Sequence, residues 1–265
     1  MTGDHRVPEG QLAQYALRVG DDALIAAQRL AEWSARAPEM EEDIALSNIA
    51  LDQLGVARFL LSLAGGADGR SEDDLAYLRD DAEFRNCLLA EVPNGGPTAP
   101  PGASGDFGVT MVKLLLLGAY QLCLYERLVD SSEASLAEVA GKARKESRYH
   151  VDHAAQWTVR LGDGTATSQA RVQQALDDLW PYTHELFEDD PLAVWAAEAG
   201  VGPLPSSLRA AWDAIVLPVL EEATLTVPPA GWHPTGGRDG RHTEHLSYLL
   251  AELQVLHRAH PGASW

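Results

Sequence analysis

Hydrophobic residues recur every three or four positions along most of the chain, which is the spacing of one face of an α-helix. The pattern predicts four long helices, at residues 21–36, 39–64, 106–131 and 136–161. Shorter helices are predicted at residues 169–188, 206–225 and 242–260. No segment shows the sustained alternation of apolar and polar residues that is typical of a half-buried strand. The sequence therefore predicts an all-α protein.

Local signals predict where several elements begin and end. Asp21 follows Gly20 and is predicted to cap the helix at 21–36. Ser71 and Asp74 have the spacing of a capping box, which predicts a short helix after them. Residues 92–105 are rich in Pro, Gly, Ala and Ser. They predict an exposed loop, either a plain connector or a loop that binds a partner or covers a site.

The long helices are predicted to pair along the chain. Two helices joined by a short connection form an antiparallel hairpin, and two such hairpins can pack as a four-helix bundle. The helix at 39–64 has apolar residues on more than one side, so it is predicted to be central. We expect residues 1–265 to fold as a single helical domain, with the three C-terminal helices added to the bundle.

Residues 146–150 come close to a metal-binding motif. Ferritin-like di-iron proteins carry Glu-x-x-His on a bundle helix, which places a carboxylate and an imidazole on one inward face. Here Tyr149 stands three positions after Glu146, and His150 stands four positions after it, where it still shares that face. A complete site needs a second such motif, yet no histidine occurs between Arg6 and Tyr149. The metal site is at best half present.

Several carboxylates have apolar neighbours that suggest burial, and a buried carboxylate needs a partner. One possibility is a polar network with Lys113, Asn48 or Arg148, which the missing histidine favours. The other is an atypical carboxylate and histidine metal centre. Its weak candidates are Glu32, Glu126, Glu146 and His150, with Asp43 or Asp52 as further ligands. The favoured interpretation assigns no catalytic, cofactor-binding or metal-binding residue to this chain.

The formal net charge of −19 argues against a nucleic-acid partner, because phosphate binding needs clustered Lys and Arg. The N-terminal residues Met1 to Pro8 lack the apolar region of a secretory signal. No uninterrupted apolar run approaches the roughly 20 residues that span a bilayer. We therefore expect a cytoplasmic protein with no membrane partner.

Segments throughout the chain together resemble one family. They are GDDALI at 20–25, RLAEW at 29–33, NIALDQLG at 48–55, FRN at 84–86, KESRYH at 145–150, Trp157 with RLGDGT at 160–165, LDDLW at 176–180 and RHTEHL at 241–246. The sequence is similar to the C-subunit family of bacterial phenylacetyl-CoA 1,2-epoxidase, a multicomponent oxygenase of phenylacetate breakdown. The resemblance covers nearly the whole chain, although the 92–105 segment looks longer than is usual for the family.

The resemblance implies a ferritin-like four-helix bundle that binds the catalytic A subunit, in which the di-iron cofactor is held, without holding iron itself. Self-association within the complex is also expected. The alternative is a ferritin-like metalloenzyme with its own atypical centre. Contacts are expected on the last three helices, where four aromatic residues are available as anchors: Trp195, Trp212, Tyr248 and Trp265. The alternative, equally favoured, is that these aromatic residues belong to the core, because Trp is usually largely buried.

Overall fold

The computed structural model describes residues 10–263, and no β-strand occurs among them, so the all-α prediction is confirmed. The α-helices in this range are α1 (Gln11–Ala31), α2 (Met40–Gly65), α3 (Glu72–Tyr77), α4 (Leu88–Glu91), α5 (Phe107–Leu128), α6 (Ala134–Gly162), α7 (Ala166–Leu179), α8 (Pro191–Glu198), α9 (Arg209–Glu222) and α10 (Glu244–Ala259). The 3₁₀ segments are η1 (Asp81–Glu83), η2 (Trp180–Phe187), η3 (Pro205–Leu208) and η4 (Gly237–Asp239). The N-terminal segment used for the localisation prediction and Trp265 lie outside the described residues.

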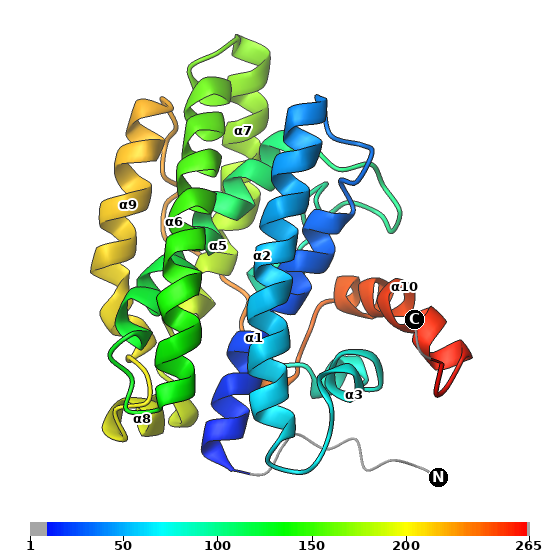
Figure 1. Ribbon diagram of the computed structural model, residues 1–265. Helices are drawn as coiled ribbons and strands as arrows, with labels where there is room; N and C mark the ends of the chain where they lie inside the picture. The colour runs from blue at the N-terminus through cyan, green and yellow to red at the C-terminus, as the bar shows by residue number, and fades with distance from the viewer. Residues whose placement is uncertain (1–9, 264–265) are drawn as a thin grey trace.

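Helices α1, α2, α5 and α6 form a four-helix bundle (Figure 1). α1 packs along α2, α5 packs along α6, and α2 contacts α6 between the two hairpins. α7 and α9 pack against α5 and α6, α8 packs against α1, and α10 packs against α3. The added helices therefore cover α5 and parts of α1 and α6.

The two most apolar helices differ in burial. By length and composition α2 and α5 could each cross a membrane, although charged residues interrupt both helices and neither is a continuous apolar run. In α5, 94% of the apolar window is buried, so α5 is the core helix of the bundle. In α2 only 44% is buried. The predicted central position of α2 is therefore wrong, because hydropathy does not distinguish a core face from an apolar outer face.

The first helix begins ten residues earlier than predicted. α1 runs from Gln11 without a break at Gly20, and it ends at Ala31 instead of residue 36. Gly20 marks a close approach between helices, because a Cβ there would lie 3.2 Å from Leu60 Cβ on α2. Asp21 is fully buried and pairs with Arg79, so it is not a helix cap. The cap preference of Asp was overridden by a tertiary ion pair.

Other signals in the sequence predicted the starts and ends of some elements correctly and of others incorrectly. The Ser71 and Asp74 capping box is present at the start of α3. The helix predicted at 169–188 is α-helical only to Leu179, and Pro181, which cannot donate a backbone hydrogen bond, follows in η2. In the range predicted as 206–225, η3 precedes α9, which ends at Glu222. The short helix α8 was not predicted, although Asp190 caps it and Pro191 suits its first position.

The 92–105 loop is anchored at its start and exposed at its tip. Val92 and Asn94 are buried, whereas residues 101–105 are exposed. Asn94 donates a hydrogen bond of 2.6 Å to the Arg29 carbonyl oxygen on α1. The exposed loop that the sequence predicts is therefore only part of this segment, because its first residues pack into the protein.

Candidate functional site

His150 lies inside the bundle, on the side of α6 that faces α2. Its ring is buried, and Nε2 lies 3.1 Å from Asp52 Oδ2. Burial lowers the pKa of His150, and the hydrogen bond to Asp52 offsets this only in part. A neutral imidazole is the form that binds metals, so protonation does not exclude a ligand role. The arrangement of the surrounding carboxylates decides the question.

A second histidine of α6 also faces a carboxylate of α2. His153 Nε2 lies 3.1 Å from Glu42 Oε2, although neither atom has hydrogen-bond geometry with a partner. His150 and His153 therefore each approach a different carboxylate of α2. The two imidazoles therefore do not converge on one carboxylate.

The three candidate glutamates lie in separate surroundings. Glu32 stands at the C-terminal end of α1, where it accepts hydrogen bonds from Arg29 and Asn94. Glu146 pairs with Lys142, one turn earlier on the same helix. The burial predicted for Glu126 is wrong, because its side chain is 43% exposed and pairs with Arg148. Its apolar neighbours along the chain lie on the other face of α5.

Two neutral amides face each other between α2 and α5. Gln53 Nε2 donates to Gln121 Oε1 at 2.6 Å, and Gln121 Nε2 donates back to Gln53 Oε1 at 3.0 Å. Both side chains are buried. Di-iron bundle sites need carboxylates and imidazoles from these helices. This reciprocal pair instead satisfies the polar atoms of both glutamines within the protein.

The donor set therefore does not fit a di-iron centre. Among residues 10–263, no group of three or more His, Cys, Asp or Glu side chains is placed to hold a metal ion. Some polar atoms of the bundle interior remain unpaired, including Tyr125 Oη, Glu146 Oε2 and His150 Nδ1. The unpaired Glu and His atoms lie on α2 (Glu42 Oε2) and α6 (Glu146 Oε2, His150 Nδ1 and His153 Nε2), whereas α1 and α5 supply none.

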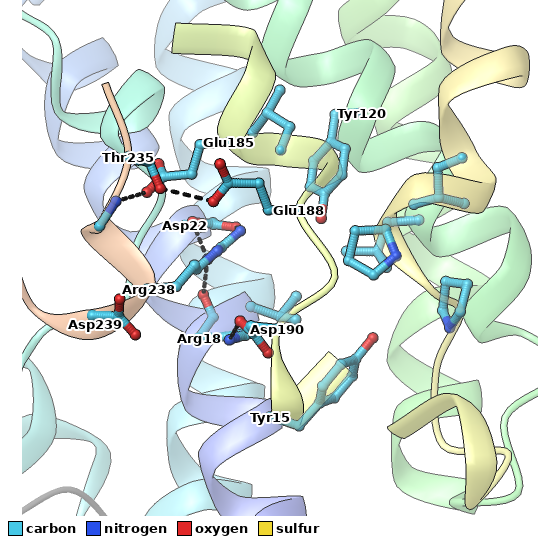
Figure 2. A pocket seen from close by; sticks show the side chains of 17 residues that line it. Tyr15, Arg18, Asp22, Tyr120, Glu185, Glu188, Asp190, Thr235, Arg238 and Asp239 are labelled. Carbon is cyan, nitrogen blue, oxygen red and sulfur yellow. Dashed lines mark hydrogen bonds and ion pairs between the residues drawn. The ribbon is translucent and has the colours of Figure 1, made fainter. Parts of the chain in front are cut away.

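A second polar cluster lies between α1 and the C-terminal segment before α10 (Figure 2). Arg238 of η4 donates to both carboxylate oxygens of Asp22 on α1, at 2.9 and 2.7 Å. Arg18, one turn earlier on α1, pairs with Asp190, the N-cap of α8. These pairs connect α1 to segments that follow more than 160 residues later.

The pocket beside these pairs is small and its charged groups are engaged. Its volume is about 60 Å³, which is room for a few water molecules and below the roughly 300 Å³ of ordinary ligand pockets. Glu185 accepts hydrogen bonds from the backbone of Gly236 and Gly237, and Glu188 accepts one from Thr235. The geometry is that of a structural network and does not resemble a substrate site.

Lys113 is a buried cation on α5 that holds the 92–105 loop. Its Nζ donates to the Val92 carbonyl oxygen at 2.6 Å and to Asn94 Oδ1 at 3.1 Å. Burial and the nearby Arg29 guanidinium lower the pKa of Lys113 from 10.5 to about 7, with Glu32 acting weakly in the opposite direction. The sequence indicated Lys113 as a network partner, and the structure places it beside a loop and away from Glu126 and Glu146.

We expect the free energy of unfolding to depend on pH through the ionisation of Lys113. The pKa of Lys113 is lower in the folded protein than in the unfolded chain. Between about pH 7 and the ordinary value of 10.5, the Lys113 amine is therefore protonated more in the unfolded chain than in the folded protein. Relative to Lys113→Met, the wild-type free energy of unfolding should rise with pH, by at most about 1.4 kcal/mol per unit. Urea unfolding of both proteins from about pH 7 to pH 9 measures this. Lys142→Met, at an exposed lysine, is the control; pH profiles parallel to wild type for both variants would refute the prediction.

A family model and a protein from Escherichia coli both match nearly the whole of this chain. The family model described as "Phenylacetic acid catabolic protein" matches residues 4–265. The C subunit of 1,2-phenylacetyl-CoA epoxidase from Escherichia coli (strain K12) is 44% identical over 256 residues, which cover 96% of this chain and 99% of that protein. This chain belongs to the phenylacetic acid catabolic protein family.

A solved structure supports the fold of this member of the phenylacetic acid catabolic protein family. A Synechococcus protein with aldehyde deformylating oxidase activity matches it with a TM-score of 0.52 at 16% identity, covering 81% of this chain and 94% of that chain. At this identity the likeness shows the fold alone. The prediction of a ferritin-like helical bundle is confirmed.

The four aromatic residues predicted as contact anchors in this family member have different surroundings. Trp212 is fully buried, and its indole donates to the Leu116 carbonyl oxygen at 2.9 Å, so it is a core residue. Trp195 is half-buried against the core. Tyr248 is 51% exposed on α10, and Trp265 lies outside the described residues. The expected contact surface on the last three helices therefore has fewer available anchors than the sequence suggests.

An exposed apolar surface of this family member was missed by the sequence reasoning. On α2, Met40, Ile44 and Leu51 are 73%, 56% and 64% exposed. Their spacing places them on one side of the helix, which is opposite to the side that packs into the bundle. The signal was present in the sequence as an apolar excess on α2, and it was interpreted as a sign of burial.

Proposed function

We propose that this chain is a non-catalytic structural subunit of a phenylacetyl-CoA 1,2-epoxidase complex in aerobic phenylacetate catabolism. In this proposal it binds and supports the catalytic A subunit, which carries the di-iron cofactor. The E. coli relative is named as the C subunit of such an epoxidase, and the match extends over 96% of this chain. A bacterial catabolic subunit of this kind is expected to act in the cytoplasm, with no nucleic-acid or membrane partner.

The observation that carries the proposal is the chemistry of the bundle interior. A di-iron bundle needs carboxylates and imidazoles from its facing helices, whereas the buried polar side chains that α2 and α5 direct at each other include the amides of Gln53 and Gln121, which bind one another. An oxygenase of this class passes electrons through iron, so its catalytic chain must hold the ligands. The donor set of this chain supports assigning that role to a partner subunit.

Volume gives independent support for a structural role. The cavity between Tyr15, Tyr120 and Arg238 measures about 60 Å³, which does not accommodate an acyl-CoA ester. The larger hollow of about 420 Å³ lies under the 92–105 loop, between α1 and α10. Its lining includes Trp33 and Tyr248 but no histidine of α6. Glu32 is the one candidate metal ligand that lines the larger hollow, and Glu126, Glu146 and His150 line neither hollow.

Co-expression tests the proposal directly. The A subunit is produced with and without this chain, both preparations are purified, and epoxidation of phenylacetyl-CoA is assayed with the cognate reductase. We expect soluble, fully active A subunit only in the presence of this chain. We also expect this chain, purified alone without chelator, to contain far less than one iron per molecule and to show no turnover.

Two results would reject the structural role. Equal yield and activity of the A subunit with and without this chain would show that no support is needed. Turnover by this chain with reductase alone, together with one or two bound metal ions, would establish the alternative of a metalloenzyme with an atypical centre. In that case Glu146→Gln and His150→Gln should each release metal, whereas Glu126→Gln, at an exposed position, should not.

A further inference from the structure

One outer face of the bundle combines exposed apolar side chains with basic ones. We call it the α2–α6 face and define it by Met40, Ile44 and Leu51 of α2 with Lys142, Lys145 and Tyr149 of α6. The two helices contact each other, and the side chains of Asp52 and His150 meet between them. The face is therefore one continuous surface made by two neighbouring helices.

The apolar part of the face follows the axis of α2. Met40, Ile44 and Leu51 are separated by four and seven residues, which places them within roughly 40° of one another around an ideal helix. The exposed apolar positions on this side continue to Leu54, so the stripe is about 21 Å long. Among the described residues, five of the thirteen exposed large hydrophobic side chains belong to α2. This concentration is larger than scattered surface exposure explains.

The α6 part of the face adds an aromatic ring and positive charge. Tyr149 is 76% exposed, more than Tyr248 of α10 at 51%. Lys142 lies beside Gly55 of α2, and Lys145 is exposed next to it on α6. Lys142 pairs with Glu146 one turn later on α6, whereas Lys145 is exposed and adds positive charge to this face. A partner that fits here has apolar residues along its centre and acidic residues at one side.

No described helix covers this face. In Figure 1, α2 and α6 run side by side at the front of the bundle; α9 flanks α6 on the side away from α2, and α8 and α10 lie away from this face. Two adjacent helices about 10 Å wide and a stripe about 21 Å long give roughly 400 Å² in projection. This is about half of the ~800 Å² that each partner buries in a stable specific interface, which suits the centre of a contact.

We propose that the α2–α6 face is the surface through which this chain binds the catalytic subunit, with an apolar and acidic helix of that subunit lying along α2 beside Lys142 and Lys145. The inference rests on the proposed function, and it adds the location and chemistry of the contact. A second copy of this chain fits less well. Two copies would bring together two chains of net charge −19, and that charge opposes association.

Leu51→Glu tests the proposal, because it places an unpaired charge in the centre of the apolar stripe. Binding of purified full-length protein to its cognate A subunit is measured on a biosensor, and the oligomeric state is measured by light scattering. We expect the Kd to rise at least about 30-fold, the effect that marks an interface hot spot. Lys145→Glu should mainly slow association, and most strongly at low salt.

Val255→Glu is the matched control, because Val255 is an aliphatic residue of α10 with 61% exposure. We expect it to bind the A subunit within about twofold of wild type. Leu51→Glu and Val255→Glu should both retain the wild-type circular dichroism spectrum and melting temperature, because neither position is in the core. If only Leu51→Glu loses binding, the loss would then come from the change at the α2–α6 face and not from unfolding.

The outcomes separate the two proposals. If wild type binds the A subunit and Leu51→Glu binds equally well, the contact lies elsewhere and the structural role still stands. If wild type itself does not bind, the structural role fails together with the inference. If wild type forms dimers that Leu51→Glu abolishes while binding to the A subunit persists, the face belongs to a second copy, and the assignment to the catalytic subunit is overturned.

Discussion

Replacing Asp21 with alanine should lower the free energy of unfolding by about 3 to 5 kcal/mol, the usual cost of stranding one partner of a buried ion pair. Both Asp21 and Arg79 have fully buried side chains. Arg79 Nη2 lies 2.5 Å from Asp21 Oδ1, and Arg79 Nη1 lies 2.9 Å from Oδ2. Oδ2 also accepts from the Arg85 backbone at 2.8 Å. The variant leaves a guanidinium in the core without its carboxylate.

The melting temperature should fall by about 10 °C, since 1 kcal/mol corresponds to a few degrees in a chain of this size. Asp239→Ala is the control, because the Asp239 and Arg241 side chains are 65% and 70% exposed. Such a pair contributes at most about 1 kcal/mol. The double variant Asp21→Ala with Arg79→Met should recover part of the loss, because it removes the stranded charge. A loss for Asp21→Ala no larger than that of the control would mean that water reaches Arg79.

The Asp21 pair also shows which features of this fold can be predicted from sequence. The capping box of Ser71 and Asp74 involves residues three apart, so the sequence is sufficient to predict it. Asp21 has a similar local signal, but its partner Arg79 is 58 residues away in the chain. Periodicity carries no information about such a partner. The helix start at Asp21 was therefore wrong, while the existence of a helix there was right.

The same limit explains the outcome for α2 and α5. Both helices are apolar enough to suggest burial on all sides, and in α5 this interpretation agrees with the structure. In α2, Leu51 and Ile44 face outward. A side chain that is buried only by a second protein has the same hydropathy as a core residue, so one sequence without its partner cannot distinguish the two. What the sequence reasoning missed is therefore the surface on which our proposed contact rests.

For the candidate metal ligands, the sequence indicated the residue types but could not indicate whether their side chains meet in space. The absence of histidine between Arg6 and Tyr149 is visible in the sequence, and it led to the expectation of a polar network. The actual partners depend on packing. Asp52 approaches His150 across the bundle, whereas Glu126 turns outward to Arg148. Gln53 and Gln121, which occupy the interior, were not singled out because neutral amides carry no spacing signal.

Glu91 should be a second position of large effect, because its buried side chain connects α4 to the start of α10. Oε1 accepts from the Thr243 backbone at 2.7 Å and from the Thr243 hydroxyl at 2.8 Å. Oε2 accepts from Asn86 at 2.9 Å and lies 2.7 Å from His242 Nδ1. An amide in place of the carboxylate can accept through only one of its two end atoms. Glu91→Gln therefore leaves buried donors unpaired, at a cost of about 1 to 3 kcal/mol for each.

The loss caused by Glu91→Gln should depend on pH through His242. Burial alone would lower the pKa of His242, but the hydrogen bond to Glu91 and its negative charge raise the pKa above 6.5. Because the folded pKa is raised, this contribution to stability is fully present below pH 6.5 and is lost as pH rises through the folded value. The destabilisation by Glu91→Gln should therefore be larger near pH 6 than near pH 9, where His242 is neutral in both proteins.

Urea unfolding of wild type and Glu91→Gln at several pH values measures the difference, and Glu252→Gln, at an exposed carboxylate of α10, is the control. Amide hydrogen exchange adds a local measurement, since residues of α10 should lose protection before those of α5 if Glu91 holds this helix. A destabilisation that is constant from pH 6 to pH 9 would show that His242 stays neutral beside Glu91. In that case the connection to α10 would rest on the neutral hydrogen bonds of Thr243 and Asn86.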